Sequence, residues 1–186
     1  MQMNELTVGI VQTCCYVLGK EDGQECIIID PGAEAARIRK AAGDRKIAAI
    51  LLTHGHFDHI GAVRELMDAD TKLIIHRLDA PLLTNAELNA GKGLIGRSIT
   101  APEATDLVKE GDELELAGLK VKVLHTPGHT PGSVCYLIDG ELFTGDTVFD
   151  FGWGRTDLPG GNESDMAASL RRLMPMVRTM PMHAGH

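Results

Sequence analysis

Thr53-His54-Gly55-His56-Phe57-Asp58-His59 follows a short apolar run and places three imidazoles and one carboxylate within six positions. Four titratable groups buried in a core would each need a polar partner, so a purely structural role for them is unfavourable. Imidazole nitrogens and carboxylate oxygens are, by contrast, common ligands of zinc and related metals. In an extended loop His54 and His56 point to the same side, whereas Asp58 and His59, at the start of the next helix, face a second point. The segment therefore predicts a loop that supplies ligands to two neighbouring metal ions.

Short apolar runs bounded by turn residues alternate along the chain with stretches of helical composition. The apolar runs are expected to form strands at 6–11, 14–18, 26–29, 47–52, 73–76, 113–116, 119–124, 133–138, 141–144 and from 181 onward. Helices are expected at 33–42, 60–67 and 78–83, and from a cap at Asn162 or Ser164 to about 174. This order, strands followed by helices and then repeated, predicts two sheets packed face to face with the helices outside.

Two connecting regions carry their own signals. The stretch 85–105 contains glycines and a proline that break regular structure. A long loop inside a compact domain is usually functional, so this stretch is predicted to lie as a flap over a site. Gly111-Asp112 and Asp139-Gly140 are predicted to be hairpin turns.

The composition limits the function classes. The 186 residues suit a single domain, predicted to span 1–186. The formal net charge is −8 and aromatic residues make up 4%, so neither a basic footprint nor a stacking surface for nucleic acid is expected. No apolar segment approaches the ~20 residues that span a bilayer, and the N-terminus lacks a signal-peptide pattern. The four cysteines form no C-x-x-C pair, so they are interpreted as free thiols of a cytoplasmic protein.

Three further candidate ligands lie at the ends of predicted strands. His129 lies in the turn 126–133 with its two Pro-Gly pairs, Asp146 follows the strand at 141–144, and His186 is the final residue. Alone, an aspartate after a glycine is ordinarily a turn former, and a lone histidine is ordinarily a core or surface residue. Together with the histidine-rich loop, in this order, the three residues become specific for a metal site.

In this arrangement the sequence resembles the metallo-β-lactamase superfamily, and within it the small glyoxalase II-like hydrolases. The motifs that carry the resemblance are Ile29-Asp30-Pro31-Gly32, His54-Gly55-His56-Phe57-Asp58-His59, Thr126-Pro127-Gly128-His129-Thr130-Pro131-Gly132-Ser133, Phe143-Thr144-Gly145-Asp146-Thr147 and Gly154-Arg155-Thr156-Asp157-Leu158-Pro159. The resemblance covers nearly the whole chain. It implies an α/β (α+β) fold, a four-layer αββα sandwich, with the site at one edge and a short C-terminal tail beyond the last ligand.

The resemblance also implies a role for each candidate ligand. The ligands of the first metal would be His54, His56 and His129, and those of the second would be Asp58, His59 and His186. Asp146 would bridge the two metals together with a water or hydroxide. Asp30 would support the ligand loop from behind. His183 is the alternative to His186 as the last ligand, and His76 and His125 are interpreted as structural.

The resemblance and the chemistry of such a site together predict a metal-dependent hydrolase. Water bound to metal loses a proton near neutral pH, and the hydroxide attacks an electrophilic carbonyl. Asp58 and Asp146 are the carboxylates expected at the reacting centre. A thiolate is a good leaving group, which favours an acyl thioester of the hydroxyacylglutathione type as the small-molecule substrate. Two divalent metals are expected, with zinc favoured and iron or manganese as alternatives.

Three other functions remain open. Persulfide dioxygenases share these motifs but use one iron, which His54 or a neighbour, His129 and Asp146 would hold. A lactone hydrolase and a non-catalytic metal-binding module are the other two. The larger glyoxalase II enzymes grip glutathione with a C-terminal helical domain for which this sequence has no residues, so the acyl carrier is open. The candidates for contact with the substrate are Arg155, Asn85 and Lys92.

Overall fold

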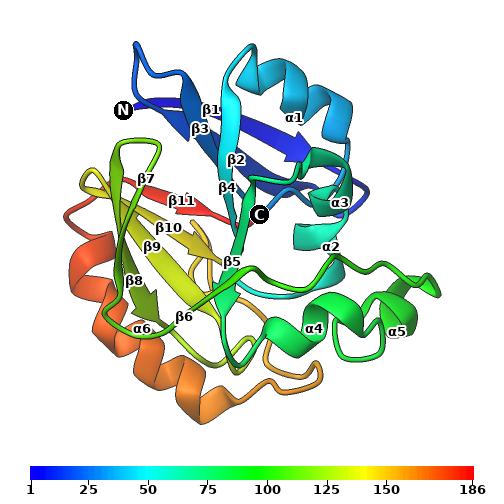
Figure 1. Ribbon diagram of the computed structural model, residues 1–186. Coiled ribbons are helices and arrows are strands. Elements are labelled where there is room, and N and C mark those ends of the chain that lie inside the picture. Colours follow the sequence, from blue (N-terminus) through cyan, green and yellow to red (C-terminus); the bar gives the residue numbers. More distant parts are fainter.

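Two β-sheets pack face to face in the computed structural model, which describes residues 1–186 (Figure 1). The first sheet has six strands in the order β1-β2-β3-β4-β5-β6. Its strands are β1 (Gln2–Val8), β2 (Thr13–Gly19), β3 (Glu25–Ile29), β4 (Lys46–Leu51), β5 (Lys72–His76) and β6 (Asp106–Val108). β1, β2 and β3 pair antiparallel, whereas the pairs from β3 to β6 are parallel.

The second sheet has five strands in the order β11-β10-β9-β8-β7. Its strands are β7 (Glu113–Leu116), β8 (Leu119–His125), β9 (Val134–Ile138), β10 (Glu141–Gly145) and β11 (Met182–Ala184). All its pairs are antiparallel except β10 with β11. Hydrogen bonds tie this sheet to the first: among them, the Tyr136 hydroxyl donates to the Leu52 carbonyl at 2.8 Å and the Val134 amide donates to the Thr53 carbonyl at 2.8 Å.

The apolar core follows from the alternation of side chains along the strands. In β3, Ile27 and Ile29 belong to the apolar cluster between the two sheets, whereas Cys26 and Ile28 belong to the cluster between the first sheet and its helices. Successive strand residues point to opposite faces, so a strand covered on both faces is apolar at every position. This explains why the first sheet was recognisable as short continuous apolar runs.

Helices cover both outer faces and complete the predicted αββα sandwich (Figure 1). The helices on the first sheet are α1 (Ala35–Ala42), α2 (Phe57–Ile60) and α3 (Val63–Leu66), and α6 (Glu163–Val177) covers the second sheet. The predicted cap at Asn162 is confirmed, because its side chain accepts a hydrogen bond from the Asp165 amide at 3.0 Å. None of the helices combines the length and the apolar character needed to cross a bilayer.

Two helix predictions differ from the structure. The helix expected at 60–67 is divided into α2 and α3 at Gly61, whose backbone packs so closely on the turn before α1 that a Cβ there would lie 2.2 Å from the Gly32 carbonyl oxygen. The stretch 85–105, expected to lack regular elements, contains α5 (Gly91–Ile95) beside α4 (Ala80–Thr84) (Figure 1).

The turn predictions are half right. Asp139-Gly140 forms the hairpin between β9 and β10, with φ values of 50° and 83°. Gly111-Asp112 does not form one, because it connects β6 in the first sheet to β7 in the second. The hairpin between β7 and β8 turns instead at Ala117-Gly118, with φ values of 49° and 73° that match a tight two-residue turn. The three-residue strand β6 was not predicted.

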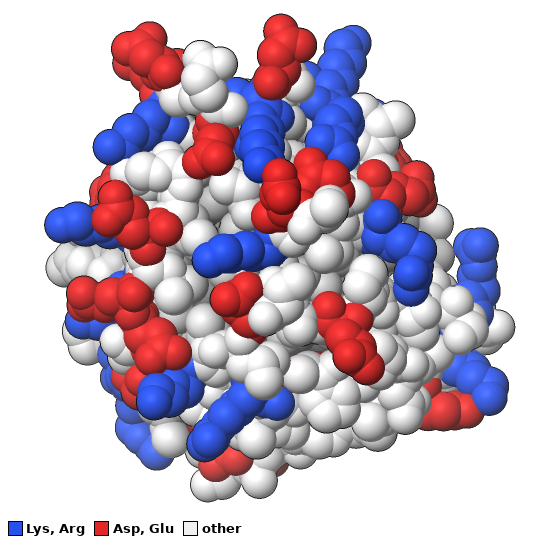
Figure 2. Space-filling model, in the orientation of Figure 1, with Lys and Arg blue, Asp and Glu red and all other residues white.

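Charged side chains of both signs are interspersed on the face shown in Figure 2. Pairs such as Lys46 with Asp70 at 2.8 Å bring opposite charges together. No extended basic patch is present on this face.

Candidate metal centre

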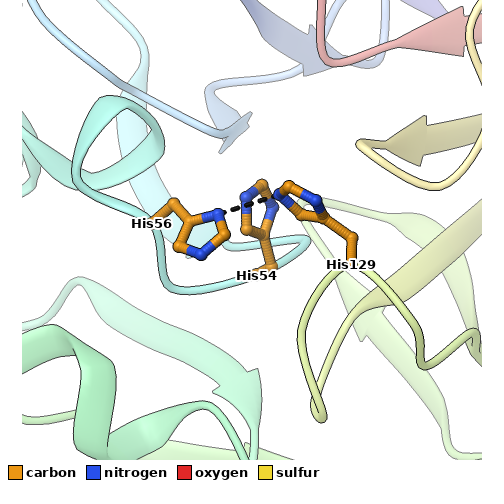
Figure 3. A group of neighbouring side chains, drawn as sticks. All are labelled: His54, His56 and His129. Atoms are coloured by element: carbon orange, nitrogen blue, oxygen red, sulfur yellow. Dashed lines mark hydrogen bonds between the residues drawn. The ribbon is translucent and has the colours of Figure 1, made fainter. Parts of the chain in front are cut away.

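The predicted ligands lie on loops that leave strands at one edge of the sandwich. The histidine-rich loop follows β4, His129 follows β8, Asp146 follows β10 and His186 follows β11. Strands β8, β10 and β11 run in the same direction, so the loops after their carboxyl ends meet at one edge. Figure 3 shows the side chains of His54, His56 and His129 converging from two of these loops.

Seven side chains form three groups whose nitrogen and oxygen atoms lie within 4.8 Å of one another. The groups are His54 with His56 and His129, His54 with His59 and Asp146, and Asp58 with His59 and His186. These are the seven residues that the sequence singled out. Because neighbouring groups share His54 or His59, the structure presents one continuous donor cluster rather than separate sites.

Asp146 lies in the middle of this cluster. Its Oδ1 lies 3.4 Å from His59 Nε2, and its Oδ2 lies 3.5 Å from both His129 Nε2 and His186 Nε2. On one side of the cluster, His56 Nδ1 lies 2.8 Å from His129 Nε2. On the other side, Asp58 Oδ2 lies 3.3 Å from His186 Nε2. The two oxygens of Asp146 therefore reach both ends of the donor set.

Unpaired donor atoms show that the cluster fits a cation. His54 Nε2, His59 Nε2 and Asp146 Oδ1 are buried and have no hydrogen-bond partner. A buried polar atom left unpaired costs about 1–3 kcal/mol. A divalent metal between these imidazole nitrogens and carboxylate oxygens would coordinate them and so satisfy the unpaired atoms. This donor set suits zinc, iron or manganese.

Asp30 holds the histidine-rich loop from behind. Its carboxylate accepts hydrogen bonds from the Thr53 amide at 2.8 Å and the Thr53 hydroxyl at 2.6 Å, and its Oδ2 lies 3.0 Å from His59 Nδ1. Because the Thr53 hydroxyl gives its proton to Asp30, it accepts one from His54 Nδ1, 3.1 Å away. The His54 imidazole is thereby held with Nδ1 protonated and Nε2 unprotonated, which is the form that binds a metal through Nε2.

His129 is oriented by a different partner. Its Nδ1 donates to the Arg155 carbonyl at 2.7 Å, which leaves Nε2 unprotonated and facing Asp146 Oδ2 and His56 Nδ1. Gly154 allows this approach, because a Cβ at that position would lie 3.1 Å from His129 Nδ1 and 1.9 Å from the Asp146 carbonyl oxygen. The motif that begins at Gly154 therefore positions a ligand through its backbone.

Asp79 joins the two ligand loops and was not predicted from the sequence. Its side chain is fully buried and accepts hydrogen bonds from the Gly55 amide at 3.0 Å, the Thr130 hydroxyl at 2.7 Å and the Gly132 amide at 2.7 Å. Burial raises its pKa, and the hydrogen bonds oppose this. Asp79 precedes α4 and reads in the sequence as an ordinary helix cap, yet its side chain makes no capping bond.

The final residues place His186, and not His183, in the cluster. Gly185 pairs with both sheets, because its amide donates to the Gly145 carbonyl at 2.9 Å and its carbonyl accepts from the Cys14 amide at 2.7 Å. A Cβ at Gly185 would lie 2.2 Å from Asp146 Oδ1. His183 points elsewhere: its Nε2 lies 2.6 Å from a Glu141 carboxylate oxygen.

The other two histidines also lie outside the cluster. His76 and His125 stack with ring centroids 4.2 Å apart and 10° between their planes. His125 Nε2 donates to the Pro131 carbonyl at 2.9 Å. His76 ends β5 and His125 ends β8, and neither belongs to the donor cluster.

The charge states differ between the two sides of the cluster. Burial and the neighbouring imidazoles hold the pKa of His54 well below its usual value, and burial beside His129 lowers the pKa of His56 to about 3. Burial alone would lower the pKa of His59 too, but Asp146, Asp30 and Asp58 outweigh it and raise that pKa well above its usual value. The excess of carboxylates around His59 marks a place that favours positive charge.

A cleft of about 550 Å³ opens onto the cluster, and His56, Asp58, His129, Asp146 and His186 form its polar floor. Arg155, a candidate for substrate contact, lies in its wall. The other two candidates do not line the cleft: the Asn85 side chain accepts amide hydrogen bonds within its own turn, and Lys92 pairs with Glu87. The predicted flap does reach the cleft, through Ala90 and Leu94.

Known families and proteins show similarity over nearly the whole chain. Residues 8–177 match the family model of the Metallo-beta-lactamase superfamily. The probable metallo-hydrolase YqgX of Bacillus subtilis is 37% identical over 195 residues, which cover 100% of this chain and 90% of that protein. The hydroxyacylglutathione hydrolase GloC of Haemophilus influenzae is 34% identical over 194 residues, covering 100% of this chain and 91% of GloC.

Solved structures show the same similarity in three dimensions. The crystal structure of BLEG-1 B3 metallo-beta-lactamase superposes with a TM-score of 0.93 at 35% identity, covering 100% of this chain and 91% of that one. The structure of TTHA1623 in a di-iron-bound form has a TM-score of 0.85 at 35% identity, covering 98% of this chain and 91% of that one.

Proposed function

The chain belongs to the metallo-beta-lactamase superfamily, and we propose that it is a metal-dependent hydrolase that holds two divalent metal ions and cleaves acyl thioesters. The observation that carries the proposal is the continuous donor cluster, with Asp146 between its two ends. One metal ion needs three or four protein ligands. Seven converging donors therefore favour two ions over one.

The proposed ligands follow the geometry of the cluster. The first metal would take His54, His56 and His129, and the second would take Asp58, His59 and His186. Asp146 would contact both. Zinc is the proposed metal from the donor set, and a di-iron centre is the alternative, because TTHA1623, at 35% identity, was solved in a di-iron-bound form.

Two divalent metals bound here would lower the pKa of a water from 15.7 toward 7 and so supply hydroxide at neutral pH. The protein orients two of the imidazoles before substrate arrives: the Thr53 hydroxyl, itself held by Asp30, orients His54, and the Arg155 carbonyl orients His129. Ligands held in this way need little reorganisation during the reaction.

The walls of the cleft favour a thioester over an amide. No lysine, tyrosine or cysteine lines the cleft, and its histidines belong to the donor cluster, so no free general acid faces a leaving group. An amine must be protonated as it leaves, whereas a thiolate leaves readily and takes its proton from solvent. In the proposed reaction the hydroxide oxygen forms a C–O bond to the acyl carbon, the C–S bond breaks, and a carboxylic acid and a thiol result. GloC, a hydroxyacylglutathione hydrolase at 34% identity, supports this class.

A second candidate function is β-lactam hydrolysis, favoured by the similarity to BLEG-1 at 35% identity. The persulfide dioxygenase alternative would use only two histidines and one aspartate, and would leave Asp58, His59 and His186 without a role. Assays of the metal-loaded protein with an acetyl thioester, a chromogenic cephalosporin and a persulfide under an oxygen electrode separate the three. We expect thiol release from the thioester to dominate. Oxygen consumption with the persulfide, or faster cleavage of the cephalosporin, contradicts the proposal.

A further inference from the structure

Away from the donor cluster, the cleft is lined mainly by apolar side chains. Val11, Leu94 and Trp153 line the cleft although 44%, 50% and 61% of their surfaces are exposed. Large apolar side chains are ordinarily withdrawn from water, and exposed ones that gather around a cleft mark a binding surface. Here they come from three separate segments: the turn between β1 and β2, helix α5, and the loop after β10.

Aromatic residues are concentrated at the same place. The chain has one tryptophan, two tyrosines and four phenylalanines. Three of these seven, Phe57, Phe149 and Trp153, line the cleft. In a chain whose core depends on aliphatic residues, this placement provides a rigid apolar surface beside the reacting centre.

The same walls offer little to a highly charged ligand. Arg155 is the only lysine or arginine that lines the cleft. It already makes a two-point ion pair with Asp157, with Nε 2.6 Å from Oδ1 and Nη2 2.7 Å from Oδ2. Lys92, on the neighbouring helix α5, pairs with Glu87. Carriers that bear phosphates or several carboxylates are bound through unpaired arginines and lysines, which these walls lack.

We propose that the substrate is a thioester with an apolar acyl chain, which packs against the apolar cleft residues Phe149, Trp153, Leu94 and Val11, on a thiol carrier that is not recognised through negative charge. This inference rests on the proposed thioester hydrolysis and narrows its substrate class. It predicts that neither glutathione nor coenzyme A is a required carrier.

The kinetic test uses two series of substrates with metal-loaded protein. In the first, acetyl, butyryl, hexanoyl and octanoyl groups are carried by neutral N-acetylcysteamine. We expect kcat/KM to rise by about two- to fourfold per added methylene until the cleft is filled. In the second, hexanoyl thioesters of N-acetylcysteamine, glutathione and coenzyme A are compared, and the charged carriers should give no gain.

Two variants locate the acyl chain. Trp153→Ala should reduce the ratio of octanoyl to acetyl kcat/KM by about tenfold, because it removes the largest apolar wall. Phe151→Ala is the matched control on the same loop: Phe151 is 99% exposed and does not line the cleft, so the ratio should not change.

A binding measurement separates this inference from the reaction itself. Trp153 is the only tryptophan, so its fluorescence reports directly on the cleft. The non-hydrolysable thioether S-octyl-N-acetylcysteamine should shift the emission to the blue and saturate, whereas the S-methyl analogue should not. A flat or falling acyl series, or a gain with charged carriers, overturns the apolar-acyl inference and leaves hydrolysis standing. Without any thioester hydrolysis the proposed function fails. If S-octyl-N-acetylcysteamine still binds saturably in that case, the apolar site is supported. If it does not bind, the apolar site is overturned as well.

Discussion

Asp79 accepts a hydrogen bond from the Thr130 hydroxyl at 2.7 Å, between residues 51 positions apart in the sequence. The same carboxylate accepts a hydrogen bond from the Gly55 amide. One buried side chain therefore holds the loop of His54 and His56 against the loop of His129. The distance between the ligands proposed for the first metal depends on this contact.

Asp79→Asn should weaken binding of the first metal by about 10- to 100-fold, as loss of a group behind a ligand typically does. The amide keeps the size of the side chain, but its NH2 group replaces one of the two oxygens that accept from Gly55, Thr130 and Gly132, so at least one of these donors would face another donor. Isothermal titration of the metal-free protein measures the change. Asp112→Asn is the control, because the Asp112 side chain accepts one hydrogen bond, from the Lys109 amide within a turn. Equal metal affinities for Asp79→Asn and Asp112→Asn would contradict the assignment.

His186→Ala should lower the metal content from two ions to about one and reduce kcat/KM by more than about 100-fold, because a proposed ligand is lost rather than an outer partner. His183→Ala is the matched comparison. It breaks the pair with Glu141 and the stacking on Phe143, with ring centroids 4.8 Å apart, so it should lower stability but keep both metals. Elemental analysis of the two variants decides which histidine is the ligand, and metal loss confined to His183→Ala would reverse the assignment.

Gly185→Ala should disturb the cluster, since its Cβ would lie 2.2 Å from Asp146 Oδ1 and 2.9 Å from the Gly145 carbonyl carbon. We expect reduced metal content and activity with a thermal unfolding midpoint only modestly lowered. Gly93→Ala adds the same methyl group to α5, where nothing lies within 4 Å of the new Cβ. It should leave metal binding unchanged and stabilise the helix by about 0.5–1 kcal/mol. Normal metal content in Gly185→Ala would contradict this prediction, because it would mean that Asp146 can move away from the new Cβ without loss of metal.

Protonation of His76 should lower the free energy of unfolding as the pH falls. Burial, together with the neighbouring His125, lowers the pKa of His76 to about 4. An unfolded histidine takes up its proton near pH 6.5. Between about pH 6.5 and pH 4 the unfolded state therefore binds more protons, so stability decreases as the pH falls.

The variant His76→Asn isolates this effect, because asparagine does not titrate and its oxygen can replace Nδ1 as acceptor for the Leu78 amide. Urea unfolding of both metal-free proteins at several pH values measures the difference in stability. We expect the wild type to lose its advantage as the pH falls from about 7 to 4.5. A pH-independent difference would assign the titration to other groups.

Much of the fold could be predicted because its strands are buried on both faces and read as continuous apolar runs, as at 26–29. The tight turns were predicted where residue types determine φ, as at Asp139-Gly140, and missed where Ala117 adopts a positive φ without a sequence signal. The division of the helix at Gly61 could not be predicted, since its cause is a close approach to Gly32, which lies 29 positions earlier.

The donor cluster was predictable because chemically distinctive residues follow strand ends. His54 could be singled out from the composition of its loop, and His129 became specific only together with that loop, whereas the ligand roles rested on the resemblance to a family. Asp79 could not be found in this way, because a lone aspartate before Ala80-Pro81 is typical of a helix cap. Its function depends on contacts with Thr130 and Gly132, which only the tertiary structure brings within reach.

The central claim is that activity depends on two metal ions held by this cluster. The most direct test combines elemental analysis of protein purified without chelator with an acetyl-thioester assay of the same sample. We predict two equivalents of a divalent metal per chain, loss of hydrolysis in parallel with metal removal by chelator, and recovery when metal is returned. We also predict no turnover for Asp58→Ala or His56→Ala with the fold retained. Full thioester hydrolysis by protein stripped of metal would contradict the account.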